Sequence, residues 1–117
     1  MPGSAADPPE DLTPEQVAQL HREGQIQLID VREPYEHDAG FIEGDRHVEF
    51  IRLSHEAGSI AKDRTVVFYC RSGGRSAVAT EVFRAAGYDA RNMTGGLLAW
   101  NREGLPLRPE GGTVADH

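Results

Sequence analysis

The chain has only one cysteine, Cys70, among its 117 residues. A single cysteine excludes an intramolecular disulfide, and it also excludes a structural zinc site built from paired cysteines. Basic residues are outnumbered by acidic ones, and the net charge is −7 at pH 7. This balance argues against nucleic acid as a partner, because phosphate binding requires a basic face.

Long apolar runs and targeting signals are missing too. No stretch approaches the roughly 18 apolar residues of a membrane-spanning helix. The first residues, MPGSAADPPEDL, lack the basic start and apolar stretch of a signal peptide. We therefore expect a cytoplasmic protein with no membrane partner. The chain length indicates one domain, because each half alone would be too short to bury a stable core.

The composition changes at both ends of the chain. Residues 1–11 hold three prolines together with small and acidic residues, which predicts a flexible lead-in. Proline, glycine and polar residues dominate again after Pro106, which predicts a flexible tail over residues 107–117. The ordered domain is expected over residues 12–106.

Predicted strands and helices alternate along this domain. We expect helices at 14–23, 54–61 and 75–86 and from 97 onward, and strands at 26–31, 48–53, 65–69 and 88–93. The 65–69 strand has no charged residue and should be buried on both faces. In the 75–86 helix, the residues expected on the buried side are Val78, Val82, Phe83 and Ala86. This alternation predicts an α/β domain with a largely parallel sheet and helices on both of its faces.

The most informative segment is Cys70-Arg71-Ser72-Gly73-Gly74-Arg75-Ser76, which joins a predicted strand to a predicted helix. Binding sites form at such carboxyl ends of strands in open α/β sheets. Adjacent glycines allow a tight turn whose N–H groups point inward, and the helix N-terminus adds partial positive charge. Two arginines add full charges. The loop therefore favours the thiolate of Cys70, which is the nucleophilic form. The alternative is an inert cysteine beside an arginine-rich turn.

This segment resembles the rhodanese family, and three other stretches agree with the resemblance. They are Leu28-Ile29-Asp30-Val31-Arg32-Glu33-Pro34, Gly40-Phe41-Ile42-Glu43-Gly44, and Thr94-Gly95-Gly96 followed by Trp100. The resemblance covers about residues 12–106. It implies a rhodanese-like fold with a central, mostly parallel, five-stranded sheet.

The resemblance also implies a chemistry and a set of roles. Cys70 would take sulfur from thiosulfate or a persulfide, hold it as a cysteine persulfide, and pass it to a thiol or to cyanide without any cofactor. Arg71, with the rest of the loop from Ser72 through Gly73, Gly74 and Arg75 to Ser76, would bind the donor. Asp30 would hold Arg71, and Arg32 would brace the ends of the strands. For Asp30 and Arg32 the alternative is a polar turn with exposed charges.

Loop length separates sulfur chemistry from phosphate chemistry. Four residues lie between Cys70 and Arg75, whereas the phosphatases that resemble rhodaneses have a longer loop around a tetrahedral phosphate. The loop also offers no aspartate as general acid for a phosphate ester. The shorter loop favours a single sulfur atom.

Departures from the family pattern lie away from the nucleophile. Phe41 stands where the family usually has histidine, and Asp45 replaces its usual alanine. These changes bear on the local backbone and the rim of the site.

Other polar residues are expected to be solvated. The five histidines include no pair at metal-ligand spacing, so no metal site is predicted. His37 and His47 could approach the cleft, but solvated loop positions are favoured. Glu33, Glu36 and Asp38 are likewise expected to form a solvated polar turn.

Three hypotheses for the function remain open at this point. The first is a sulfurtransferase acting on small donors, and the second is a persulfide carrier that relays sulfur between protein partners. The third is a binding module that keeps the fold without the chemistry.

Overall fold

The computed structural model describes residues 10–117. The predicted flexible lead-in therefore lies almost wholly outside the described residues. No helix in the described part of the chain is long and apolar enough to cross a membrane.

A parallel sheet with strand order β2-β1-β3-β4 forms the centre of the fold. Its strands are β1 (Ile26–Asp30), β2 (Arg46–His47), β3 (Thr65–Tyr69) and β4 (Ala90–Asn92). The expected fifth strand is absent from residues 10–117, which form a sheet of four. Leu12 only makes a single bridge to Met93, because the chain turns into a helix at the next residue, Thr13, which caps that helix. The strand expected at 48–53 is also wrong, since only the pair Arg46–His47 before it joins the sheet.

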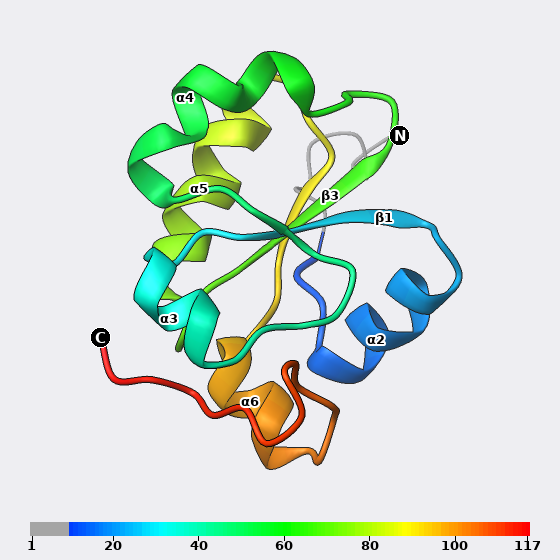
Figure 1. The fold of residues 1–117 in the computed structure, drawn as a ribbon. Coiled ribbons are helices and arrows are strands. Elements are labelled where there is room, and N and C mark those ends of the chain that lie inside the picture. The colour runs from blue at the N-terminus through cyan, green and yellow to red at the C-terminus, as the bar shows by residue number, and fades with distance from the viewer. Residues whose placement is uncertain (1–9) are drawn as a thin grey trace.

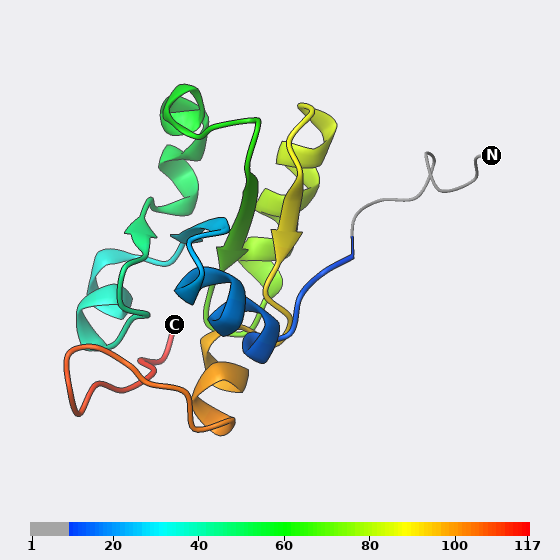
Figure 2. The ribbon, with the colours of Figure 1, turned by 90° about the vertical axis from the view of Figure 1, so that its right-hand side faces the viewer.

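Helices cover both faces of the sheet, as the sequence predicted (Figure 1). They are α2 (Pro14–Arg22), α3 (Pro34–Ala39), α4 (Leu53–Glu56), α5 (Gly74–Ala85) and α6 (Gly96–Arg102), with short 3-10 turns at Phe50–Arg52 and Ala57–Ser59. One apolar cluster joins a face of the sheet to α4 and α5 through residues such as Leu53, Phe68 and Phe83. The other joins the opposite face to α2 and α6 through Val17, Val67 and Leu97. The two views in Figures 1 and 2 show this three-layer arrangement.

The buried side of α5 is only partly the expected one, since Phe83 is buried as predicted but the two valines are not. Val78 and Val82 are 52% and 58% exposed, whereas Ser76, Ala79, Thr80 and Phe83 face the interior. The small and hydroxylated side chains allow α5 to lie close to the sheet. Thr80 satisfies its hydroxyl by donating to the Ser76 carbonyl within the helix at 2.7 Å.

The sheet brings two loops to one edge. Asp30 is paired with Tyr69 at the ends of β1 and β3, so the loops that follow these residues leave the sheet side by side. Residues 66–69 of β3 have 0% exposure, which confirms a strand buried on both faces. Cys70 is the next residue after this rigid strand.

The C-terminal segment returns to the same edge. Phe41 and Arg108 exchange backbone hydrogen bonds at 2.8 Å, and the Thr113 N–H donates to the Ala39 carbonyl at 2.9 Å. Val114 packs against the core cluster on the α2 and α6 face. The segment that the sequence predicted to be a flexible tail thus lies against α3 along several contacts (Figure 1).

Candidate active site

Cys70 lies at the start of a tight loop between β3 and α5. The residue is 1% exposed. Gly73 caps the N-terminus of α5 with φ +107°, in the left-handed region that favours glycine. This turn points the backbone back toward the cysteine.

Three donors surround the Cys70 sulfur. The Gly73 N–H lies 3.1 Å from Sγ, and the N–H and hydroxyl of Ser76 lie 3.5 and 3.3 Å from it. These donors sit at the N-terminus of a 12-residue helix, whose partial positive charge adds to theirs. The arrangement favours a negatively charged sulfur at this position.

Asn92 is a site residue that the sequence analysis missed. Its side-chain oxygen lies 2.6 Å from the Ser76 hydroxyl, and its amide donates to the Gly73 carbonyl at 3.3 Å. The Ser76 hydroxyl has one hydrogen and two acceptors within reach, Asn92 and Cys70. The placement of Asn92 at the end of β4, beside the cysteine strand, is the signal that could have identified it.

Arg75 is anchored to Glu36. Its two terminal nitrogens donate to the two Glu36 oxygens at 2.8 and 2.9 Å. Glu36 has 0% exposure, so the expectation that it belongs to a solvated turn is wrong. Burial raises the pKa of Glu36, but hydrogen bonds from Arg75 and the Glu33 backbone outweigh burial and hold this pKa below its usual value. Its position three residues after Glu33, with Pro34 opening the helix, is a capping-box pattern that could have been recognised.

Asp30 binds Arg32 and not Arg71. Its carboxylate accepts bonds from Arg32 Nε and Nη2 at 2.9 and 2.8 Å and from the Arg32 N–H at 2.9 Å. Arg32 also donates to the Gly40 carbonyl at 2.7 Å, and both side chains of the pair have 0% exposure. The predicted Asp30–Arg71 contact is therefore wrong, because the shorter reach to Arg32 takes both carboxylate oxygens. The expected bracing of the strand ends by Arg32 matches these contacts, whereas an exposed polar turn does not.

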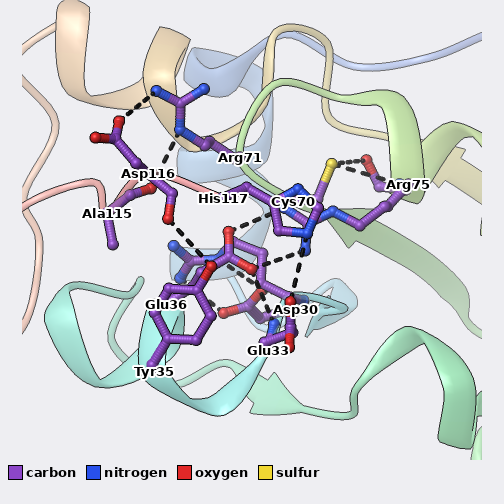
Figure 3. Close-up of polar contacts among 12 residues, drawn as sticks. Asp30, Glu33, Tyr35, Glu36, Cys70, Arg71, Arg75, Ala115, Asp116 and His117 are labelled. Atoms are coloured by element: carbon purple, nitrogen blue, oxygen red, sulfur yellow. Dashed lines mark hydrogen bonds and ion pairs between the residues drawn. The ribbon is translucent and has the colours of Figure 1, made fainter.

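Arg71 instead faces the C-terminal segment. Its Nε donates to the Ala115 carbonyl at 3.1 Å, and its Nη2 lies 3.2 Å from the Asp116 carboxylate (Figure 3). The Arg71 side chain is 30% exposed. Among the loop residues, Ser72 and Gly74 are exposed as well.

A second glycine turn packs against the backbone of the cysteine loop. Gly95 and Gly96 have φ of +78° and +61°, and the N–H groups of Leu97 and Leu98 donate to the carbonyls of Cys70 and Arg71. A Cβ on Gly96 would lie 2.6 and 2.5 Å from these two carbonyl oxygens. Gly96 is thus required for the close backbone approach to the cysteine loop.

The two departures from the family pattern contact the same histidine. The Phe41 ring stacks on His37 at 4.3 Å, and His37 Nε2 lies 3.2 Å from Asp45. Asp45 also accepts a 2.6 Å bond from the hydroxyl of Tyr69, the residue before Cys70. Burial raises the pKa of Asp45 despite these two bonds. The departures thus form a local packing arrangement around His37, and none of these contacts reaches Cys70 itself.

Among residues 10–117, two side-chain clusters have the size of a metal site. Their ligand atoms lie within 4.8 Å of one another in Asp30, His37 and Asp45 and in Glu33, Glu36 and His117. In each cluster one carboxylate is already committed to an arginine, Arg32 or Arg75.

Comparison with known proteins agrees with this geometry. Residues 13–103 match the family described as the rhodanese-like domain. The chain belongs to the rhodanese-like domain family. The chain is 40% identical over 88 residues to a protein named sulfurtransferase from Allochromatium vinosum, which covers 74% of this chain and 82% of that one. It is 32% identical over 90 residues to the thiosulfate sulfurtransferase GlpE of Pseudomonas aeruginosa, covering 76% and 81%.

Solved structures place the fold in the same family. The crystal structure of a rhodanese-related protein from Thermoplasma volcanium superposes with a TM-score of 0.80 and 25% identity, covering 86% of this chain and 99% of that one. Several other sequence relatives of this rhodanese-like chain are longer proteins, of which it spans 54% or less.

Proposed function

We propose that this rhodanese-like chain is a sulfurtransferase that carries sulfur on Cys70 as a persulfide. The observation that carries the proposal is the set of three donors 3.1 to 3.5 Å from Sγ, in a chain with no other cysteine. Donors held by a glycine turn and a helix N-terminus stabilise sulfur anions without having to reorganise during the reaction.

The first half-reaction loads the sulfur. The Cys70 thiolate attacks the outer sulfur of thiosulfate, a new S–S bond forms, and sulfite leaves with the electron pair of the broken S–S bond. With a persulfide donor the same attack releases a thiolate. In the second half-reaction a thiol or cyanide takes the outer sulfur and Cys70 leaves as thiolate, which completes a ping-pong cycle with no external oxidant.

The residues around Cys70 divide this work. Gly73 and Ser76 hold the charge of the bound sulfur, Asn92 positions Ser76, and the Glu36–Arg75 pair anchors the start of α5 behind the loop. Arg71, together with the exposed Ser72 and Gly74, binds the incoming donor. Asp30 and Arg32 support the loop from the neighbouring strand.

A relay between protein partners is the second candidate. A pocket of about 210 Å³ beside Arg75 is lined by Phe50 and Ile51, which are 37% and 79% exposed. Exposed apolar side chains at the mouth of a site suit a protein that delivers or accepts sulfur. A cytoplasmic location would suit either function, because the lone thiol must stay reduced. A binding module without chemistry has no comparable support, since the donors around Cys70 are intact.

Intact mass spectrometry tests the proposal directly. We expect thiosulfate to add about 32 Da, the mass of one persulfide sulfur, and cyanide to remove it. The Cys70→Ser variant should fold normally and gain no mass. A wild-type protein that gains no sulfur from thiosulfate or from a small persulfide would contradict the small-molecule enzyme. Slow loading by thiosulfate alone, with fast loading by persulfides, would favour the relay.

A further inference from the structure

The C-terminal segment passes along the outer side of the pocket and is held there by several elements. The Tyr35 hydroxyl donates to the Asp116 carbonyl at 3.2 Å, and His117 Nε2 lies 3.4 Å from the Glu33 carboxylate. Upstream, Thr113 is bonded to Ala39, and its backbone fills the space where a Cβ on Gly40 would lie. These contacts fix residues 113–117 next to Arg71 (Figure 3).

This segment places a carboxylate on Arg71, the residue that follows the nucleophile. Arg75 is committed to the buried Glu36, whereas Arg71 binds Asp116, whose side chain is 99% exposed. An anionic donor that needs Arg71 must take the place of this carboxylate. An exposed ion pair contributes little free energy. A donor can therefore displace the Asp116 carboxylate from Arg71 at a small cost in binding free energy.

We propose that Asp116 is a specificity-determining residue, which competes with small dianionic donors for Arg71 and thereby favours donors of lower charge. Thiosulfate carries two negative charges, whereas a persulfide of an uncharged thiol carries at most one. Asp116 therefore raises the apparent KM for thiosulfate more than the KM for such a persulfide. This inference rests on the proposed sulfurtransferase function and narrows its donor class.

The kinetic test compares two charge-neutralising variants of the full chain. Asp116→Asn should raise kcat/KM for thiosulfate about two- to fivefold, the range expected for an exposed ion pair. The gain should come from KM, should shrink at high salt, and should be small with N-acetylcysteamine persulfide as donor. The control is Glu110→Gln, which removes the same charge from an exposed tail residue. An equal gain in both variants, or an equal gain with both donors, would overturn the proposal.

A binding measurement separates this inference from the sulfurtransferase function. Calorimetric titration of thiosulfate into Cys70→Ser protein requires no sulfur transfer. Adding Asp116→Asn should lower Kd about two- to fivefold, whereas adding Glu110→Gln should not. If this shift in Kd appears but no persulfide ever forms, Asp116 controls anion binding as proposed, and the sulfurtransferase proposal is wrong. If persulfide forms but Kd is unchanged or thiosulfate does not bind, the role of Asp116 is wrong.

Discussion

The floor and the rim of the site use the same chemistry in different surroundings. We define the floor as Cys70, Ser76, Asn92, Glu36 and Arg75, and the rim as Arg71, Tyr35, Asp116, Glu33 and His117. The floor's arginine–carboxylate pair is 2.8 Å long with a fully buried carboxylate, whereas the rim's pair is 3.2 Å long with a carboxylate that is 99% exposed.

Because of this difference in burial, the two arginines of the loop have different roles. Removing one partner of a buried pair leaves an uncompensated charge and is strongly destabilising. An exposed pair is screened by water and contributes at most about 1 kcal/mol. Arg75 is therefore part of the scaffold that holds the sulfur, whereas Arg71, four residues nearer the cysteine strand, is free to exchange its partner for a substrate.

The largest effect on stability is expected at the second glycine turn, which packs against the backbone of Cys70 and Arg71. Gly96→Ala should lower the free energy of unfolding by about 3 kcal/mol, because it adds left-handed strain and a clash with two carbonyl oxygens. Gly104→Ala is the matched control, since Gly104 has φ +77° but no atom within 4 Å of its Cβ position. Gly104→Ala should lower the free energy of unfolding, measured by urea denaturation, by only about 1 kcal/mol. Equal losses would mean that close approach at Gly96 does not support the floor.

A smaller loss is expected when the buried pair of the floor is broken. Glu36→Gln leaves Arg75 without its countercharge and should lower the free energy of unfolding by about 2 kcal/mol at neutral pH. The folded-state pKa of Glu36 lies below its unfolded value, so its contribution is complete above the unfolded pKa and is lost as the pH falls through the folded one. The difference between wild type and variant should therefore shrink in acid.

The exposed pair Glu43–Arg108 provides the control for this prediction. It has the same 2.8 Å length, but its side chains are 71% and 46% exposed. Glu43→Gln should change the free energy of unfolding by less than about 0.5 kcal/mol in the same pH series. A loss as large as that of Glu36→Gln would show that burial is not what distinguishes the floor.

The sequence predicted the parts of the site that depend on local chemistry. The strand 65–69, the glycine turn and the following helix fix where Cys70 lies, because each is encoded within a few residues. The partners of the charged residues were harder. Asp30 has Arg32 two residues away and Arg71 on the loop after the neighbouring strand, and in the structure the nearer guanidinium takes its carboxylate.

Long-range packing explains the contacts that the sequence did not indicate. From the sequence, Glu36 is expected at the surface because it is charged. In the structure, α3 brings it into contact with Arg75, 39 residues later in the chain. The tail looks flexible by composition, yet Arg71 of the cysteine loop and Tyr35 and Ala39 of α3 supply its partners from two other segments. No residue pattern within 107–117 indicates these contacts, because the partners lie elsewhere in the sequence. Local sequence therefore could not predict them.

The smallest effect on stability is expected at the rim, where the comparison is most easily reversed. Arg71→Gln should raise KM for thiosulfate roughly tenfold, because a charge-assisted bond to the donor is lost. It should change the free energy of unfolding by less than about 0.5 kcal/mol, since the lost ion pair is exposed. Steady-state kinetics with thiosulfate and urea denaturation of the same preparation measure both quantities. Arg52→Gln is the control, because Arg52 is 62% exposed and makes only a 3.8 Å ion pair with Glu56. If Arg71→Gln destabilised the fold as much as Glu36→Gln and left KM unchanged, Arg71 would belong to the floor, and the division of labour between the two arginines would be wrong.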